Sequence, residues 1–317
     1  LNYFTGSKAH NIAIRTRGVQ AGLKINEYGV FRGGERVSGA KEADVFAAVG
    51  LPTIEPELRE DRGEIEAASE GRLPALVSLE DIRGDLQSHT LASDGQADIA
   101  AMARAAQARG YEYLAVTDHS RRLTVAHGLD AARLAQQIRD IDRLNGSLRG
   151  FRVLKSVEVE IIEDGSLDLD DGILRELDLV VGAVHFKLNL PRAAQTERLV
   201  RALDHPRLHI LAHPTGRLIG ERAACDLDLE RLVRAARERG CALELNAQPR
   251  RLDADDRLCR MARGQGVKIA LSSDAHDPAG LDAMRFGIGQ ARRGWLEPND
   301  ILNTRPWSAV RKLLRRA

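Results

Sequence analysis

The sequence predicts an α/β fold in which seven parallel strands form a barrel, preceded by a small α+β unit. From about residue 80 onward, short apolar runs alternate with amphipathic stretches of helical spacing, which is the pattern of repeated βα units around a parallel sheet. Seven such apolar runs can be counted. This number favours a closed or nearly closed barrel, with an open sheet as the alternative.

The small unit is expected to occupy residues 1–52. Its last helix should end at Gly50-Leu51-Pro52, because glycine accepts the left-handed conformation at a helix end and proline cannot continue the helix. The predicted elements are a helix from Ser7 to about Gly22, strand-like pieces at 24–31 and 35–37, and a helix at 40–49.

Charge is distributed unevenly along the chain, although the formal net charge is only +1. Residues 1–26 carry four basic side chains and no acidic one, whereas residues 55–70 carry seven acidic and two basic side chains. By charge alone, each run is expected to be a solvated face. Residues 53–80 are polar and acidic and contain Pro56 and Pro74, so they are predicted to form an extended linker before the barrel.

Composition predicts a globular protein of the cytoplasm. With 43% hydrophobic residues in a chain of 317, a full core can be buried. No run of about 18 apolar residues occurs, and the first residues lack the basic and apolar regions of a signal peptide. We therefore expect no membrane partner.

The repeating part of the chain, residues 81–317, supplies the strands and helices of the barrel. Its apolar runs are four to seven residues long, which suits buried strands better than helices. The predicted strands are 84–87, 113–117, 153–159, 179–184, 209–212, 242–245 and 268–272, and the predicted helices are 98–109, 131–144, 194–204, 229–239, 254–264 and 281–292.

Potential metal ligands stand at the C-terminal end of nearly every predicted strand, which is the active face of such barrels. Residues two apart on an extended segment point the same way, so Asp274 and His276 should reach one site, and position 87 should pair with His89. His209 begins a strand and does not fit this pattern. The ligand candidates on the strand ends are His89, Asp94, His119, Glu158, His185, His213, Asp274 and His276.

These eight side chains predict more than one metal ion. Zinc-type ions take about four protein ligands, and mixed nitrogen and oxygen ligands favour Zn²⁺, Mn²⁺ or Fe²⁺ over Mg²⁺ or Ca²⁺. We expect two or three ions per chain, Mn²⁺ or Zn²⁺. Such a centre suits metal-assisted hydrolysis of a phosphate ester. Spacing does not separate this chemistry from amide hydrolysis on a barrel of the amidohydrolase type.

Seven segments in order resemble the polymerase and histidinol phosphatase (PHP) domain: GDLQSHT, SDG, TDHS, SVEVE, AVH, AHPTGR and SSDAH. The resemblance spans about residues 81–317 and implies a (β/α)7 barrel with a trinuclear metal centre. It implies one metal held by Gln87, His89, Glu158 and Asp274, a second by Glu158, His185 and His213, and a third by Asp94, His119 and His276.

Gln87 departs from the wider PHP pattern, which has a histidine at that position. A neutral amide oxygen is a weaker and harder ligand than imidazole. We therefore expect the first metal to bind more weakly, or to be Mn²⁺ in preference to Zn²⁺, while the other two sites are intact.

The start of the chain, YFTGSKAHN followed by Arg15 and Asn26-Glu27-Tyr28-Gly29, is similar to the thumb subdomain of family X DNA polymerases. In that family, positions matching Tyr3, Phe4, Asn11 and Arg15 contact the incoming nucleotide or the template. The acid-free stretch 1–26 is then a DNA-facing surface. Thumb, linker and PHP domain resemble the C-terminal part of a bacterial or archaeal family X polymerase, and the palm subdomain with its catalytic aspartates is not in this chain.

This resemblance implies a metal-dependent phosphodiesterase for DNA 3′ ends in base excision repair, with 3′–5′ exonuclease, apurinic-site endonuclease and end-trimming activities. Glu158, Asp274 and His276 are predicted to be catalytic. Arg217 is a candidate phosphate clamp, with a structural salt bridge as the equal alternative. The expected partners are gapped, nicked or 3′-recessed DNA and the palm and N-terminal domain of a parent polymerase, near the nucleoid. The alternatives are a degenerate scaffold or DNA-binding module and a small-molecule phosphoesterase of the histidinol-phosphatase type.

Overall fold

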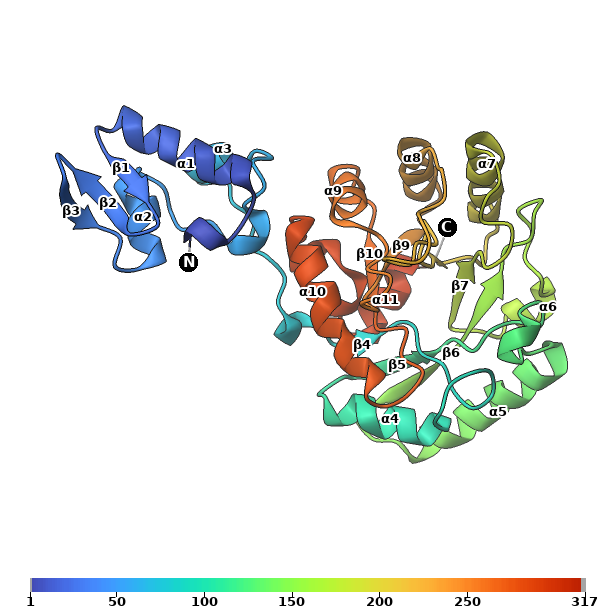
Figure 1. Ribbon diagram of the computed structural model, residues 1–317. Coiled ribbons are helices and arrows are strands. Elements are labelled where there is room, and N and C mark those ends of the chain that lie inside the picture. The colour runs from blue at the N-terminus through green and yellow to red at the C-terminus, as the bar shows by residue number, and fades with distance from the viewer. Residues whose placement is uncertain (1, 315–317) are drawn as a thin grey trace. The chain divides into compact units, whose positions relative to one another are not determined.

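The structure, a computed structural model, describes residues 2–314 and divides the chain after Ala75 into two units (Figure 1). The first unit is α+β. Helix α1 (Lys8–Gln20) begins at Ser7, whose hydroxyl accepts the backbone N–H of His10. It is followed by a three-stranded antiparallel sheet and by helix α2 (Glu42–Ala48). The strands of the sheet are β1 (Lys24–Asn26), β2 (Gly29–Arg32) and β3 (Glu35–Ser38).

The segment 53–75 belongs to the first unit and differs from the extended linker expected there. It forms a short 3-10 helix, η2 (Pro56–Leu58), and helix α3 (Glu64–Ser69). Arg59 is fully buried and donates to the Ile54 carbonyl, while its own carbonyl accepts the N–H of Ser7 at 2.7 Å. Because these side chains are buried with partners, the segment folds against the start of α1. The exact boundaries of the predicted domains stay a prediction.

The second unit is a nearly closed parallel barrel, so the predicted fold class is confirmed. Seven strands pair in chain order, from the first to the last, and every pair is parallel. The two edge strands approach each other only beyond their ends, where Ser88 forms a parallel bridge with Ala275. The strands are β4 (Gly84–Asp85), β5 (Tyr113–Val116), β6 (Arg152–Glu160), β7 (Leu179–Ala183), β8 (Ile210–Leu211), β9 (Ala242–Asn246) and β10 (Ile269–Ser272).

The helices of this unit begin at the positions that their caps dictate. Four of them start after an aspartate whose side chain accepts the backbone N–H three residues on, namely Asp98, Asp130, Asp228 and Asp255. All six predicted helices are present with small shifts of their ends, and α6 and α11 were not predicted. The helices are α4 (Ile99–Ala108), α5 (Ala131–Ser147), α6 (Asp171–Leu174), α7 (Arg192–Leu203), α8 (Leu229–Arg239), α9 (Asp256–Gly264), α10 (Met284–Arg293) and α11 (Trp307–Leu314).

Two apolar layers hold the barrel. One fills the space between the strands and the surrounding helices. The other, built from alternate strand residues such as Leu154, Val181 and Ile210, fills the barrel interior and includes Val310 and Leu314 of α11. Helix α11 therefore packs against the interior layer. The buried polar side chains of the predicted ligands lie elsewhere, at the C-terminal ends of the strands. Along residues 2–314, no helix has the length and apolarity needed to cross a bilayer.

Candidate metal centre

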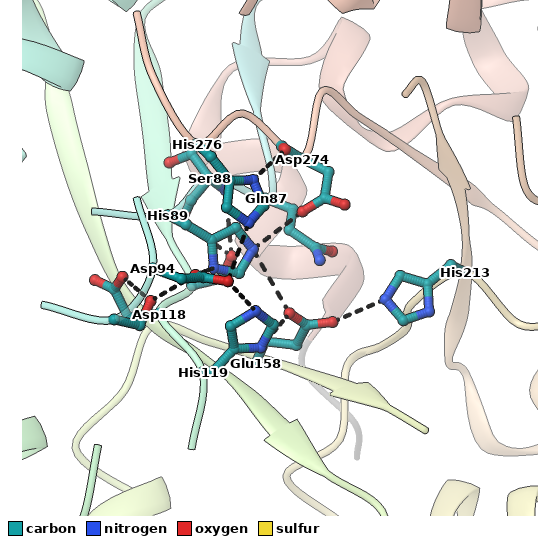
Figure 2. Close-up of polar contacts among 12 residues, drawn as sticks. Gln87, Ser88, His89, Asp94, Asp118, His119, Glu158, His213, Asp274 and His276 are labelled. Atoms are coloured by element: carbon teal, nitrogen blue, oxygen red, sulfur yellow. Dashed lines mark hydrogen bonds and ion pairs between the residues drawn. The ribbon is translucent and has the colours of Figure 1, made fainter. Parts of the chain in front are cut away.

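The predicted ligands meet at the C-terminal ends of the strands, as Figure 2 shows for His89, Asp94, His119, Glu158, His213, Asp274 and His276. Two groups of ligand atoms are compact, and they differ from the three sets that the resemblance implies: His89 joins Asp94, His119 and His276, and His119 stands in place of His213 beside Glu158 and His185. The donor atoms of His89, Asp94, His119 and His276 all lie within 4.8 Å of one another, and so do those of His119, Glu158 and His185. Side chains from the first strand end and from the last are thus in the same cluster, which the near-closure of the barrel requires.

Glu158, on β6, lies at the middle of the cluster and is almost completely buried. Its Oε1 is 3.0 Å from His213 Nε2 and 3.6 Å from His185 Nε2. Its Oε2 is 3.0 Å from His119 Nδ1 and 3.6 Å from His89 Nε2. One carboxylate therefore faces four imidazoles through its two oxygens, which is the arrangement expected of a ligand shared between ions.

Asp94 forms the open side of the cluster. Its Oδ2 is 3.5 Å from both His119 Nε2 and His276 Nε2, and its side chain is 33% exposed. The side chain of His276 is 35% exposed, while that of Glu158 is only 1% exposed. A substrate can therefore approach from the side of Asp94 and His276, with Glu158 at the buried floor.

Asp274 reaches the centre by a route that differs from the one expected. It was expected to share an extended segment with His276, but its φ is 53°, in the left-handed region. His213 at the end of β8 also has a positive φ, of 24°. Such backbone is costly for residues other than glycine, by about 1–3 kcal/mol, and is found at functional sites where the surrounding structure holds it. Here it turns Asp274 Oδ1 to 3.0 Å from His89 Nε2.

The surroundings of the Gln87 side chain indicate whether the centre is suited to a cation. The side chain is 1% exposed, and neither of its amide atoms has a hydrogen-bond partner among the described residues. It lies beside Asp274 and His89 in Figure 2. A buried amide without a partner costs free energy, and a cation bound to its oxygen would remove that cost. The position is therefore suited to an oxygen ligand.

The charges of the centre also favour a cation. Burial lowers the pKa of His119, yet the carboxylates of Glu158 and Asp94 outweigh it and raise that pKa to about 10. Burial raises the pKa values of Asp94 and Asp274, but the histidines around them outweigh burial, so both pKa values are lowered. The field that stabilises a positive imidazolium at this place would stabilise a divalent ion in the same way.

Several supporting residues were not predicted. Glu160 accepts a hydrogen bond from His185, with Nδ1 and Oε2 at 2.7 Å, and orients this imidazole. Asp118 accepts from the Thr90 N–H and from the Ser93 hydroxyl, at 2.7 and 2.5 Å, and fixes the loop between His89 and Asp94. Both stand within two residues of a candidate ligand, a signal that could have pointed to them.

Arg217 does not point at the cluster. Its Nε donates to the Arg251 carbonyl at 2.8 Å, and its guanidinium also binds the Leu252 carbonyl. The geometry corresponds to the structural alternative rather than to a phosphate clamp, although the partners are carbonyl groups and the ion pair with Asp255 is long, at 3.9 Å. The guanidinium nearer to the ligands is that of Arg251, 3.7 Å from Asp274.

The four residues predicted to face a nucleotide lie together in the first unit. Tyr3, Asn11 and Arg15 line one small pocket with Ile14. The Arg15 guanidinium lies 5.1 Å from the centre of the Tyr3 ring. Tyr3 is 46% exposed and Phe4 is 81% exposed. Their nucleotide contacts stay a prediction.

Comparison with known proteins identifies both units. Residues 1–60 match the family model "DNA polymerase beta thumb". The whole chain is 44% identical, over 318 aligned residues, to the DNA polymerase/3′-5′ exonuclease PolX of Bacillus subtilis (strain 168), and it spans 55% of that relative's length. It is 30% identical to a probable phosphatase of Thermoanaerobacter sp. (strain X514), over 69% of this chain and 89% of the relative.

Two further matches concern the same class of proteins. A probable phosphatase of Acetivibrio thermocellus is 33% identical over 61% of this chain and 78% of the relative. Among solved structures, histidinol phosphate phosphatase of Lactococcus lactis subsp. lactis Il1403, in complex with zinc, L-histidinol and phosphate, is 16% identical with a TM-score of 0.45, covering 66% of this chain and 93% of that one. With a polymerase thumb, a seven-stranded barrel, a relative 44% identical over both parts and a phosphatase relative, the chain belongs to the PHP-containing family X DNA polymerases, of which it spans the thumb and PHP portions.

Proposed function

We propose that this chain is a metal-dependent phosphodiesterase that removes nucleotides from DNA 3′ ends. The single observation that carries the proposal is the cluster at the barrel end. Three carboxylates and five imidazoles face one another there, and Gln87 adds a buried amide without a partner. The polymerase and phosphatase relatives support a phosphoesterase of the PHP type that uses divalent metal ions.

We assign the ions by the three ligand sets that the resemblance implies. Glu158 with His185 and His213 would hold one ion, Asp94 with His119 and His276 another, and Gln87, His89 and Asp274 with Glu158 a third. When bound, Mn²⁺ or Zn²⁺ would lower the pKa of a water molecule and neutralise charge on the phosphoryl oxygens. Apurinic-site cleavage and 3′-end trimming would use the same centre.

The protein's own groups prepare this centre. Glu160 holds His185 by Nδ1, which leaves Nε2 directed at Glu158. The Asn246 amide donates to Asp274 Oδ2 at 3.0 Å and fixes that carboxylate. The buried floor at Glu158 excludes bulk water, and the exposed edge at Asp94 and His276 admits the substrate.

Exposed apolar side chains near the centre favour a nucleic acid over a small metabolite. Leu91 follows His89 by two residues, and Phe186 directly follows His185. Leu91, Phe186 and Ile219 are 65, 37 and 52% exposed on loops that follow candidate ligands, and Val125 is 84% exposed in the short 3-10 helix η4 (Thr124–Ala126) after His119. Unpaired bases stack on aromatic side chains such as Phe186, with about 1–3 kcal/mol per base.

The thumb match supports DNA as the partner and a parent polymerase as the context. In this proposal, Tyr3, Phe4, Asn11 and Arg15 contact gapped, nicked or 3′-recessed DNA. The palm and N-terminal domain of the parent protein would supply synthesis. Base excision repair is the process in which both activities would serve.

Hydrolysis of a small phosphate monoester is the second candidate, because several relatives are named probable phosphatases. The two are compared by incubating the purified chain and Mn²⁺ with 5′-labelled 3′-recessed DNA or with histidinol phosphate. We expect the labelled strand to shorten stepwise, and the monoester to be hydrolysed far more slowly. Hydrolysis of the monoester alone would establish the second candidate.

Two variants tie the activity to this centre. Asp274→Asn and His276→Ala should abolish shortening of the DNA while the circular dichroism spectrum is unchanged. His205→Ala is the matched control, because His205 pairs with Asp171 at 2.9 Å and is not among the candidate ligands. Undiminished shortening by either site variant would contradict the proposal.

A further inference from the structure

We propose that Arg251 is the residue that binds the substrate phosphate at the candidate metal centre, and that Arg217 holds the loop that carries it. This inference rests on the proposed function and adds a residue to it. A phosphate of the DNA backbone would be bound through the Arg251 guanidinium, on the open side of the cluster.

The loop after β9 places Arg251 next to the end of β10. The backbone N–H groups of Arg251 and Leu252 both donate to the Gln248 carbonyl, at 2.8 and 2.9 Å. The Gln248 side chain in turn donates to the carbonyls of Ser273 and Asp274, at 2.7 and 3.1 Å. The loop is therefore attached to the segment that delivers Asp274, and Arg251 moves with it.

The Arg251 guanidinium keeps its donors available. A guanidinium has five N–H donors. Among the residues that the structure describes, Arg251 makes no side-chain hydrogen bond, and its one ion pair is long, with Nε 3.7 Å from Asp274 Oδ2. A structural Arg–carboxylate pair is normally closer, at about 2.7–2.9 Å. The side chain is 19% exposed, so it is held near the centre and still open to a ligand.

A cavity of about 380 Å³ lies in front of this guanidinium. Arg251, Gln248, Asp274 and His276 are among the residues that line it, so the arginine and two candidate ligands face the same space. The space is large enough for a phosphate with an attached sugar. An anion there would contact Arg251 from one side and the cluster from the other.

Other arginines of the barrel are already engaged, including Arg250, which lines the same cavity. Arg198 donates to the carbonyls of Ile162 and Phe186 at 3.0 and 2.9 Å, and Arg250 binds Glu221 through distances of 2.6 and 2.8 Å. Arg217 binds the carbonyls of Arg251 and Leu252. Arg217 thus supports the backbone of the very residue whose side chain faces the cavity.

Phosphate is the anion that suits this position. Its tetrahedral oxygens accept two N–H donors of a guanidinium at once, which a lysine cannot offer with the same geometry. The charge of Arg251 would also offset repulsion between the phosphodiester and Asp274. The side chain acts by binding substrate, so its loss should affect KM as well as kcat.

The test compares Arg251→Ala and Arg251→Lys with the control Arg201→Ala, an arginine on α7 that is 59% exposed and pairs with Glu197. We expect Arg251→Ala to lower kcat/KM for 3′-recessed DNA about 10- to 100-fold, the range for a charged hydrogen bond. Arg251→Lys should fall in between, and Arg201→Ala should change kcat/KM less than about threefold. Bound metal, measured by plasma mass spectrometry, should be the same in all four proteins.

A second readout needs no DNA hydrolysis. Inorganic phosphate should raise the Tm of the metal-loaded chain and of Arg201→Ala, and raise it much less in Arg251→Ala. If the wild-type chain shortens no DNA, the proposed function fails, while the phosphate effect on Tm still decides the role of Arg251. An equal effect of phosphate on Arg251→Ala, or a loss of metal that accompanies the loss of activity, would overturn the inference and assign Arg251 to the support of Asp274.

A double-mutant comparison tests Arg217. Arg217→Met removes the donors and keeps much of the stem. If Arg217 acts only through Arg251, the double variant Arg217→Met, Arg251→Ala should lose no more kcat/KM than Arg251→Ala alone, within about twofold. Additive losses would show that Arg217 has a separate function.

Discussion

The two units of the chain bury charged side chains in different ways. In the first unit, Arg59 donates to a carbonyl of its own segment, and the Glu64 carboxylate accepts the N–H groups of Asp61 and Arg62 at 2.8 and 2.7 Å. In the second unit, Glu158 and Asp274 face imidazoles at 3.0 Å or more, and Gln87 has no partner among the described side chains. The first arrangement is complete without a ligand. The second leaves polar capacity for one, which is the difference between a structural and a functional buried charge.

The largest expected effect of a single substitution is at the middle of the second arrangement. Glu158→Gln removes a charge that faces four imidazoles, so we expect bound metal to fall and kcat for DNA to drop about a thousandfold or more. Metal content and DNA shortening are the measurements. Glu163→Gln is the control, because this partly exposed glutamate pairs with Arg122 and Lys187 and is not a candidate ligand. Full metal content in Glu158→Gln would break the comparison.

A substitution in the first arrangement should affect stability and leave chemistry intact. Arg59→Ala breaks an ion pair in which Arg59 is buried and Glu42 is 22% exposed, so the cost should lie below the value of about 3–5 kcal/mol for a fully buried pair. We expect the unfolding of the first unit to shift to lower urea concentration, followed by fluorescence, with hydrolysis of a short single-stranded substrate unchanged. Lys24→Ala, on exposed β1, should leave both properties as they are. Loss of hydrolysis in a chain with a folded barrel would show that the two units are coupled.

A smaller effect on metal affinity is expected from Glu160, whose carboxylate holds the candidate ligand His185 in the second unit. Glu160→Gln weakens the support of His185 and should reduce metal affinity or activity about 10- to 100-fold. Titration of the metal-free protein with Mn²⁺ gives the affinity. An unchanged affinity would mean that His185 needs no such orientation.

A substitution at Gln87 tests the contribution of a single candidate ligand in the second unit. Gln87→His supplies an imidazole in place of the amide, so we expect the weakest-bound ion to bind about tenfold more tightly and to shift in preference from Mn²⁺ to Zn²⁺. Competition between the two metals, followed by mass spectrometry, measures both. Equal occupancy and equal preference in the two proteins would show that Gln87 does not limit the site.

The smallest effect is a pH dependence of the first unit. Burial raises the pKa of Glu64, but hydrogen bonds from His10 and the backbone outweigh it and lower that pKa below the ordinary 4.5. Its contribution to stability is therefore full above pH 4.5 and is lost as the pH falls through the lowered pKa, by about 1.4 kcal/mol for each pKa unit. Glu64→Gln should flatten the dependence of the unfolding free energy between pH 5 and 3, a range of about two units. An identical slope in the variant would assign the effect to other carboxyls.

The barrel and the positions of its ligand candidates could be predicted because each depends on a short segment of the sequence. An apolar run followed by His, Asp or Glu places a polar group at a strand end, and parallel strands put all these ends on one face. The role of Arg217 could not be predicted in this way. It follows His213 by four residues, yet its direction depends on the loop of Arg251, which is close in space and distant in sequence. The amphipathic α11 and the folded segment 53–75 depend on tertiary packing in the same sense.

The contact between the edge strands β4 and β10 affects when the ligand cluster can form during folding. Ser88 meets Ala275 there, so His89 and Asp274 belong to the strands that leave the ribosome earliest and latest within the barrel. Strand β4 is synthesised first, and β10 is synthesised only after nearly the whole chain. Contacts between residues so far apart in sequence form late in folding. A nascent or truncated chain can thus carry six strands while its cluster of candidate ligands is still incomplete.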